Sequence, residues 1–311
     1  MRGYTTKAMI LGAGSLALLL AGPALAADMP TKAPKAEAAP PPPPPFDIAF
    51  GAAVSNDYNF RGVSQSNRRW SGGGYVEPQW NGKFGQIYLG VAGWRIDWPS
   101  TPAYAFTDPS AEIDFYGGWR NTYGKYSIDL GFIYYYYPSE TFNGLTRQSD
   151  FWEIYSKSSY ALTPDLTIGW NSYFTPDLLH YSTSIAASGA TGKARASYAS
   201  LTGKYVLPWK QGDWGSYVSG ELGHWWIKDN GFLASAPGVY VDPSYTYWNA
   251  GLSVTYKIWT LDLRYHGNDM SVAQCATFLF SAVGNPSNKW CNDAYIATLK
   301  VDTTMSALLS K

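Results

Sequence analysis

The sequence predicts an all-β protein: a transmembrane antiparallel β-barrel of about twelve strands, with short periplasmic turns and long extracellular loops. Three observations favour this class over its alternative, a soluble all-β protein. Apolar and polar residues alternate along much of the chain, short connections alternate with long ones, and aromatic residues, 17% of the 311, gather near strand ends. Equal numbers of basic and acidic residues, 23 of each, argue against a nucleic-acid partner, which would require a basic face.

Alternation with a period of two is typical of a strand with one apolar and one polar face. The clearest case is the segment 125–137, whose apolar face carries Tyr126, Ile128, Leu130, Phe132, Tyr134 and Tyr136. From residue 46 onward the same pattern predicts strands at 46–58, 69–80, 84–97, 111–122, 125–137, 150–162, 165–175, 196–207, 214–227, 244–257, 259–267 and 293–303. Most of these are long enough for a tilted strand to cross a bilayer core.

The connections between these strands alternate in length without exception. Short turns are expected near 81–83, 123–124, 163–164, 208–213 and 257–258. The long connections are 59–68, 98–110, 138–149, 176–195, 228–243 and 268–292. Outer-membrane barrels have short periplasmic turns and long external loops, and an even strand number leaves both termini in the periplasm.

Aromatic residues lie beside both kinds of connection, which predicts two girdles at the two lipid interfaces. Those beside the short turns are Trp80, Phe84, Tyr123, Tyr126, Trp209, Trp214 and Trp259. Those beside the long loops are Trp94, Trp98, Tyr134, Tyr135, Tyr136, Tyr137, Trp225, Trp226, Tyr245, Tyr247 and Trp248.

The first residues predict export. Arg2 and Lys7 precede an apolar stretch that ends in Ala24-Leu25-Ala26, which is typical of a secretory signal peptide over residues 1–26, with an uncleaved anchor as the alternative. Residues 27–45 include six consecutive prolines and predict a semi-rigid periplasmic linker, with a peptidoglycan or partner contact as the alternative. We expect the barrel over 46–304 and a tail over 305–311, located in the cell outer membrane in contact with its lipid.

Two cysteines, Cys275 and Cys291, lie in the exported part of the chain. An even pair in an oxidising compartment predicts a disulfide, with two free thiols as the alternative. No Cys or His spacing suits a metal, and no cofactor is expected.

If the apolar faces meet lipid, the polar faces line the lumen. The candidate lumen residues are Glu77, Glu112, Asp114, Arg120, Asp129, Glu153, Lys157, Lys204, Glu221, Asp262, Arg264, His266 and Lys300. Charges of both signs predict a hydrated interior, and twelve strands predict a narrow one that admits small hydrophilic solutes. The alternative is a structural or surface-interaction barrel, closed inside by salt bridges, whose long loops bind external partners. The mixed list leaves the charge of the solute open.

An enzyme is the competing functional class. The chain has three histidines, His180, His224 and His266, and none stands in a recognisable nucleophile motif. We therefore expect no catalytic site.

The segment Val54-Ser55-Asn56-Asp57-Tyr58-Asn59-Phe60-Arg61-Gly62-Val63-Ser64-Gln65-Ser66 closely resembles the N-terminal signature of a proteobacterial family. Its members are described as Gcw_chp proteins of unknown function or as TorF-type porins. The shared motif residues are Ser55, Asp57, Tyr58, Phe60, Arg61, Gly62, Ser64, Gln65 and Ser66. The resemblance implies an outer-membrane barrel with a transport role and brings no catalytic residues. Asp57 and Arg61 are candidates for an ion pair, either at the lumen mouth or fixing the first hairpin.

The C-terminus departs from the usual barrel pattern. Such chains commonly finish on a terminal aromatic strand, whereas residues 303–311 contain no closing Phe. A short tail after the last strand is the preferred interpretation.

Overall fold

The computed structural model describes residues 43–98, 106–107, 109–142, 145–146, 149–180, 193–228, 234–236, 239–240, 242–278 and 289–310. The expected signal peptide, 1–26, and most of the expected linker, 27–45, lie outside the described residues.

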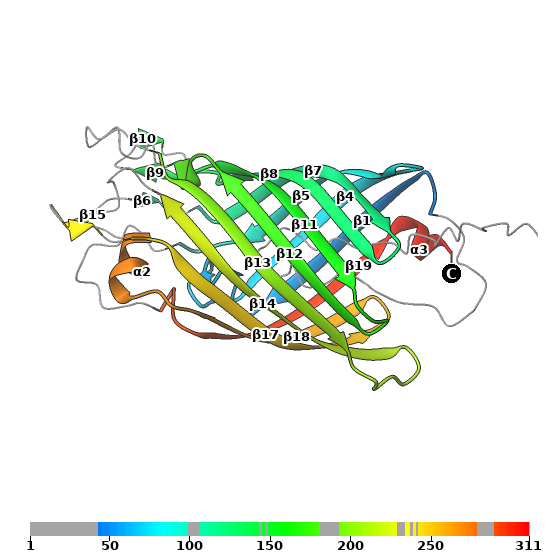
Figure 1. Ribbon diagram of the computed structural model, residues 1–311. Coiled ribbons are helices and arrows are strands. Elements are labelled where there is room, and N and C mark those ends of the chain that lie inside the picture. The colour runs from blue at the N-terminus through cyan, green and yellow to red at the C-terminus, as the bar shows by residue number, and fades with distance from the viewer. Residues whose placement is uncertain are drawn as a thin grey trace, which may run out of the picture.

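Twelve antiparallel strands form one closed barrel, which confirms the predicted fold class and strand number (Figure 1). The barrel strands are β1 (Phe46–Ser55), β4 (Ser71–Gly82), β5 (Gly85–Arg95), β7 (Ala111–Tyr123), β8 (Tyr126–Tyr136), β11 (Phe151–Ala161), β12 (Leu166–Thr175), β13 (Arg195–Val206), β14 (Trp214–Lys228), β17 (Tyr245–Tyr256), β18 (Trp259–Asn268) and β19 (Ala294–Thr304). Each pairs with its sequence neighbours in the barrel, and β1 pairs with β19 from Ala49↔Thr304 to Ser55↔Thr298. Closure leaves the sheet without an unpaired edge.

Short and long connections emerge at opposite ends of the barrel, as predicted (Figure 1). Only two residues separate β17 from β18, and Lys257 there has a positive φ of 53°. The long connections hold the small elements β2 (Asn59–Phe60), β3 (Val63–Ser64), β6 (Phe106–Thr107), β9 (Thr141–Phe142), β10 (Leu145–Thr146), η2 (Leu178–His180), β15 (Ala234–Ala236), β16 (Val239–Tyr240) and α2 (Val272–Phe278). None of the helices in the described residues is long and apolar enough to span a membrane.

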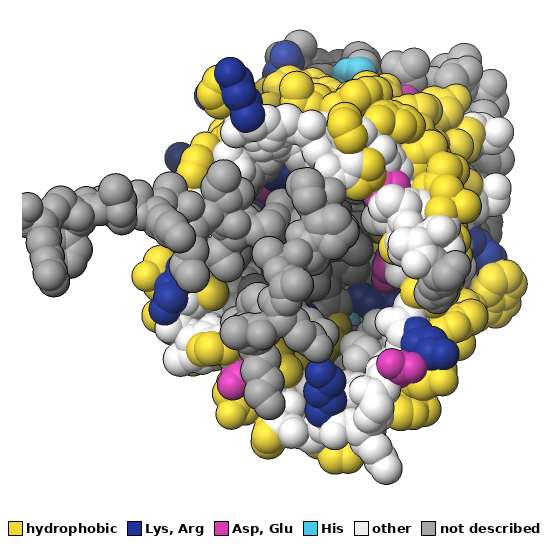
Figure 2. Space-filling model, turned by 90° about the vertical axis from the view of Figure 1, so that its right-hand side faces the viewer, with side chains coloured by type: hydrophobic (Ala, Val, Ile, Leu, Met, Phe, Trp, Pro, Cys, Tyr) yellow, Lys and Arg dark blue, Asp and Glu magenta, His cyan; other side chains and the backbone are white. Residues whose placement is uncertain are grey.

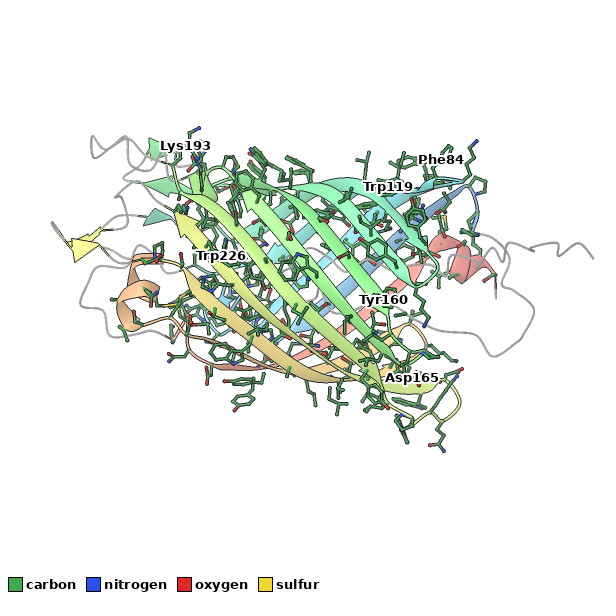
Figure 3. All side chains as sticks on the ribbon, viewed as in Figure 1. Phe84, Trp119, Tyr160, Asp165, Lys193 and Trp226 are labelled. Atoms are coloured by element: carbon green, nitrogen blue, oxygen red, sulfur yellow. A yellow bond between two sulfur atoms is a disulfide. The ribbon has the colours of Figure 1, made fainter. Side chains whose placement is uncertain are left out.

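Side-chain exposure alternates along the strands because successive residues of a strand point to opposite faces. In β19, Tyr295 and Leu299 are exposed, whereas Ile296 and Lys300 are buried. Large apolar side chains are likewise exposed on the other strands, and they include Leu89, Phe115, Phe132, Ile154, Leu201, Leu222 and Leu263. Hydrophobic side chains cover the outside of the barrel, and the labelled Trp226 and Tyr160 point away from it (Figures 2 and 3). The outer wall is thus apolar and the inner wall polar, the arrangement that a bilayer requires.

The aromatic residues beside the short turns lie on the outer wall, as predicted: Trp80, Phe84, Tyr123, Tyr126, Trp209, Trp214 and Trp259 are all exposed. The girdle predicted at the loop end is wrong for six residues, whose side chains are buried inside the barrel: Trp94, Tyr135, Tyr137, Trp225, Tyr245 and Tyr247. The physical reason is the same alternation. Of two adjacent rings such as Trp225 and Trp226, only one can face outward, and the other enters the barrel.

The last strand, β19, ends at Thr304, and the short helix α3 (Met305–Leu309) follows it at the turn end of the barrel (Figure 1). The Thr304 hydroxyl accepts a hydrogen bond from the Ala307 amide at 3.2 Å and so caps the helix. The Ser306 amide donates to the Asp47 carboxylate at 3.0 Å. The second contact holds the C-terminal residues against the beginning of β1.

Candidate functional site

The first long connection, residues 56–70, folds into the barrel; we call it the first loop. Its strands β2 and β3 form a hairpin through Asn59↔Ser64 and Phe60↔Val63, and all four of these residues are buried. The sequence analysis placed this segment in an external loop, and the structure corrects that expectation. The signature motif is therefore an inserted hairpin, and its buried side chains contact the inner wall.

The turn of this hairpin is formed by Arg61 and Gly62, which have positive φ values of 46° and 90°. A Cβ atom at Gly62 would lie 3.0 Å from the Tyr247 ring and 3.1 Å from the Asn268 amide nitrogen. Glycine at position 62 therefore satisfies both the left-handed backbone and the close approach to the wall.

Asp57 fixes the shape of the first loop. Its carboxylate accepts hydrogen bonds from the hydroxyls of Ser64 at 2.6 Å and Ser66 at 2.9 Å. It also forms an ion pair with Arg68 at 3.2 Å. Burial raises the pKa of the Asp57 carboxyl, against the lowering effect of the Ser64 hydrogen bond and the Arg68 charge. Three polar residues of the motif, Asp57, Ser64 and Ser66, therefore stabilise the conformation of the first loop through contacts with one another.

Arg61 carries the hairpin's main contact with the barrel wall. Its guanidinium forms two hydrogen bonds of 2.9 Å to the two carboxylate oxygens of Glu153 on β11, and both side chains are 1% exposed. The structure thus corrects the expected Asp57–Arg61 pair: Arg61 pairs with Glu153, and Asp57 pairs with Arg68. Glu153 lies 92 residues after Arg61 in the sequence, and Arg68 lies 11 residues after Asp57.

Aromatic rings surround the same guanidinium. Its central carbon lies 4.3 to 4.9 Å from the ring centroids of Phe60, Tyr173, Tyr198 and Trp225. The Tyr135 hydroxyl donates a hydrogen bond of 3.0 Å to Glu153. A permanently charged group out of contact with water is stabilised here by a carboxylate and by ring faces in place of hydration. We call Glu153, Tyr135, Tyr173, Tyr198 and Trp225 the guanidinium cage.

Other contacts tie the first loop to strands further around the barrel on both sides of β11. The Tyr245 hydroxyl on β17 donates to the Arg61 carbonyl at 2.9 Å, and the Asn268 amide on β18 donates to the Gly62 carbonyl at 2.8 Å. On β7, Glu112 accepts a hydrogen bond of 2.6 Å from the Tyr58 hydroxyl. Contacts with β7, β11, β17 and β18 mean that the first loop spans the cross-section of the barrel near its loop end.

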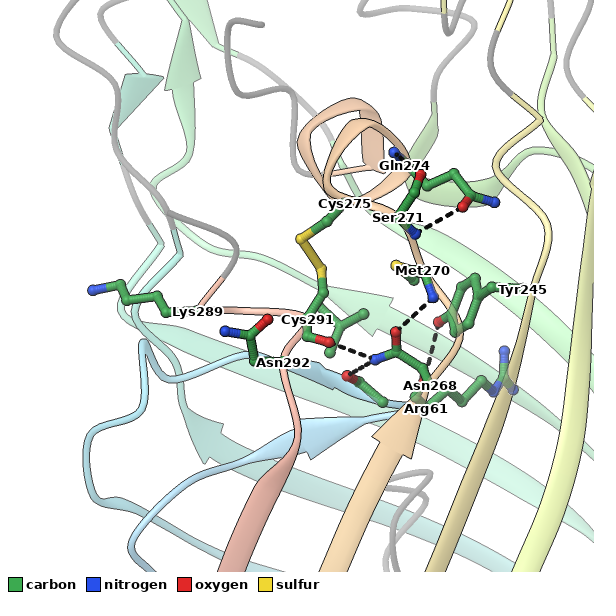
Figure 4. The surroundings of a disulfide bond; sticks show 12 residues. Arg61, Tyr245, Asn268, Met270, Ser271, Gln274, Cys275, Lys289, Cys291 and Asn292 are labelled. Atoms are coloured by element: carbon green, nitrogen blue, oxygen red, sulfur yellow. Dashed lines mark hydrogen bonds between the residues drawn. A yellow bond between two sulfur atoms is a disulfide. The ribbon is translucent and has the colours of Figure 1, made fainter. Parts of the chain in front are cut away.

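The predicted disulfide between Cys275 and Cys291 is present (Figure 4). It joins α2 to the residues that precede β19. The Asn268 amide donates to the Cys291 carbonyl at 2.8 Å as well as to Gly62, and Arg68 donates to the Lys289 carbonyl at 2.6 Å. The disulfide therefore fixes the last long connection where it contacts the first loop.

Replacing both cysteines, C275S/C291S, is expected to lower the free energy of unfolding by about 3 kcal/mol, the chain entropy of closing a loop of about 15 residues. The cysteines are separated by 16 positions. Urea unfolding in lipid vesicles measures the difference. A reduced wild-type sample is the matched control, and it should lose the same free energy; if neither loses any, the bridge adds nothing to the packing of the first loop.

Eleven of the predicted lumen residues have buried side chains: Glu77, Glu112, Asp114, Arg120, Asp129, Glu153, Glu221, Asp262, Arg264, His266 and Lys300. Lys157 and Lys204 are half-buried. The structure does not bring these residues together at one point; it distributes them along the inner wall.

Within the barrel, cations alternate with carboxylates and ring faces. Arg120 forms an ion pair with Glu77, and Arg264 forms one with Asp262 at 2.9 Å. The ammonium groups of Lys157 and Lys204 lie 4.5 Å and 3.8 Å from the rings of Tyr155 and Tyr217. In contrast, both oxygens of the buried Asp114 carboxylate lack a hydrogen-bond partner within the part of the chain that the structure describes. The interior is polar and mixed in sign.

The sequence matches a family model described as "Bacterial protein of unknown function (Gcw_chp)" over residues 37–299. This chain belongs to the Gcw_chp family. The match covers the first loop and nearly the whole barrel. A comparison with curated proteins finds no significant match.

Among solved structures, this Gcw_chp protein is similar to the NanC porin, with 10% identity, a TM-score of 0.41, and coverage of 83% of this chain and 98% of that one. An outer membrane channel from Pseudomonas putida F1 has 13% identity and a TM-score of 0.43, with 85% and 96% covered. LpxR from Salmonella typhimurium has 9% identity and a TM-score of 0.40, with 82% and 99% covered. These similarities concern the barrel architecture alone.

In the Gcw_chp barrel, a cavity of about 30 Å³, room for about one water molecule, lies among the first loop, β5, β18 and β19, with Asp57, Trp94 and His266 in its lining. His266 shares a hydrogen bond of 2.9 Å with the Tyr247 hydroxyl, and His224 shares one of 3.0 Å with the Thr246 hydroxyl. No group of three or more His, Cys, Asp or Glu side chains suited to a metal occurs among the described residues.

Sequence reasoning selected Glu153 and Arg61 separately and missed the rings around them. The missed cage residues are Tyr135, Tyr173, Tyr198 and Trp225. The alternation of inward and outward residues along each strand was the signal that could have identified them as inward-facing. Tyr135, for example, alternates with the outward Tyr136, so it belongs to the inner wall with the charged residues.

Proposed function

We propose that this protein is an outer-membrane porin-like channel for passive diffusion of small hydrophilic solutes through a narrow, mixed-charge lumen. The observation that carries the proposal is the division of the barrel wall: large apolar side chains cover the outside, and charged side chains cover the inside. Charged groups on an inner wall remain hydrated or paired while the outer wall stays in lipid. The signal peptide and periplasmic linker expected from the sequence belong to the same proposal.

The first loop is the constriction of this channel. It spans the barrel near the loop end, and its contacts with Glu153, Tyr245 and Asn268 hold it there. A solute has to pass beside the hairpin or displace it. Selection then depends on the width left by the first loop and on the charges that face it.

Conductance across planar lipid bilayers tests this function. Purified protein, folded as judged by its heat-modifiable migration on a gel, should give discrete conductance steps. A variant with residues 57–68 replaced by a short Gly-Ser linker should give larger steps, because the constriction is gone. If neither folded protein conducts at any applied voltage, the channel proposal is wrong.

A closed structural barrel is the second candidate. The observation that favours it is the density of contacts around Arg61, which is fully buried among Glu153 and four aromatic rings. Under this alternative the long loops bind external partners. Loop-shortened variants that leave solute uptake unchanged and abolish a surface interaction would favour it.

We assign no catalytic role. His224 and His266 have the hydroxyls of Thr246 and Tyr247 as hydrogen-bond partners, which supports the proposal that neither imidazole activates a serine. Replacing His180, His224 and His266 in turn should leave conductance within the variation of the wild type; loss of a hydrolytic activity in any of the three would contradict this assignment.

A further inference from the structure

We infer that the guanidinium cage is a binding site for solutes that carry a guanidinium group, and that Arg61 occupies it as a resident ligand. The inference rests on the proposed function in one respect: a solute has to reach the cage through the barrel. The binding site itself follows from the geometry of the inner wall.

The wall supplies every group of the cage. Tyr135 comes from β8, Glu153 from β11, and the rings of Tyr173, Tyr198 and Trp225 from β12, β13 and β14. These five strands are consecutive in the barrel, so backbone pairing fixes the spacing of the cage. Arg61, in contrast, belongs to a connection. The cage therefore persists when the hairpin withdraws, whereas its present occupant leaves with the hairpin.

The chemistry of the cage favours a guanidinium over other ligands. Two parallel hydrogen bonds of 2.9 Å to both Glu153 oxygens match the planar fork of a guanidinium. Three wall rings lie 4.3 to 4.6 Å from its central carbon. A planar, weakly hydrated cation gains from such stacking, whereas a compact ammonium offers neither the fork nor the plane. Anions are excluded by the Glu153 carboxylate.

Withdrawal of Arg61 leaves the Glu153 carboxylate without its cation, beside three ring faces. A carboxylate flanked by ring faces favours a planar cation over water alone, so the cage takes up such a cation when the hairpin leaves. A guanidinium solute thus competes with Arg61 for the same groups. Its binding shifts the first loop toward the withdrawn position, since a ligand stabilises the conformation that it binds.

The closing experiment removes the resident ligand and supplies a free one. The R61A variant is titrated with ethylguanidinium chloride, and its thermal unfolding in detergent is followed. We expect stabilisation that saturates, with an affinity at least about ten-fold higher than that of R61A/E153Q, in which the ionic partner is gone. Propylammonium should bind R61A more weakly than ethylguanidinium does.

The matched control is R69A, which replaces another arginine of the same loop with alanine. Arg69 pairs with Asp97 at 2.9 Å, and its side chain is 63% exposed, so no enclosed carboxylate is left behind. Ethylguanidinium should not stabilise R69A. Should R61A fail to fold, its refolding yield with and without ethylguanidinium is the readout, and R61A/E153Q again serves as the comparison. Equal responses of R61A and R61A/E153Q overturn the inference.

Conductance separates this inference from the proposed function. Ethylguanidinium should raise the open probability of the wild-type channel and leave that of E153Q unchanged. Saturable, Glu153-dependent binding without any conductance would retain the cage and reject the channel. Conductance without Glu153-dependent binding would retain the channel and reject the cage.

Discussion

The R61A substitution should lower the free energy of unfolding by about 3–5 kcal/mol, the cost of leaving one partner of a buried ion pair uncompensated. Arg61 and Glu153 are each 1% exposed, so water does not replace the lost guanidinium. The same change should raise conductance, because the hairpin loses its bond to β11 and its stacking on three wall rings. Urea unfolding in lipid vesicles, followed by tryptophan fluorescence, measures the stability change.

Two comparisons show whether the effect comes from the buried pair. R69A removes an exposed pair of the same loop and should cost no more than about 1 kcal/mol. The double variant R61M/E153L replaces both charges with apolar side chains and should recover most of the loss. If R61A and R69A are equally stable, the ion pair does not hold the first loop in place.

A charged residue on the outer wall should produce the second large effect. Leu222 is 56% exposed and lies midway along β14, which spans Trp214–Lys228. The L222R substitution is expected to lower the free energy of unfolding in a bilayer by about 2–4 kcal/mol, the range for arginine on the lipid face near the midplane of a barrel. Folding titrations in vesicles of defined lipid composition measure this difference.

The control for L222R places the same charge outside the expected bilayer. Gln211 is exposed in the turn between β13 and β14, and Q211R should change the stability by less than about 1 kcal/mol. A small cost for L222R, equal to that of Q211R, would mean that this part of the outer wall does not face lipid.

Much of the barrel could be predicted because its signals are local. Alternation within a strand decides which residues face outward, and this parity placed Glu112 and Phe115 on opposite walls. The same alternation predicted the number of strands, and connection lengths predicted the end at which each loop lies. The disulfide could be predicted from two facts, the even number of cysteines and the oxidising compartment to which the chain is expected to be exported. Each of these features depends on residues that are close in the sequence.

The interior could not be predicted in the same way. The sequence analysis assigned residues 59–68 to an external loop and six inner rings to a loop-end girdle, and both assignments were wrong. Runs such as Tyr134–Tyr137 carry aromatic residues on both faces, so composition alone does not say which rings face lipid. The role of the inward-facing rings depends on the hairpin that packs against them.

Taken alone, the amino-acid sequence determined the closed all-β architecture, the parity of each strand and the mixed-charge inner wall, because the backbone's two-residue repeat converts a local pattern into two faces. Only the tertiary structure decided that the first loop enters the barrel and that Arg61 meets Glu153. Those residues lie 92 positions apart, and the Tyr245 contact with Arg61 spans 184. Which loop fills a barrel depends on such long-range contacts, which no local pattern encodes.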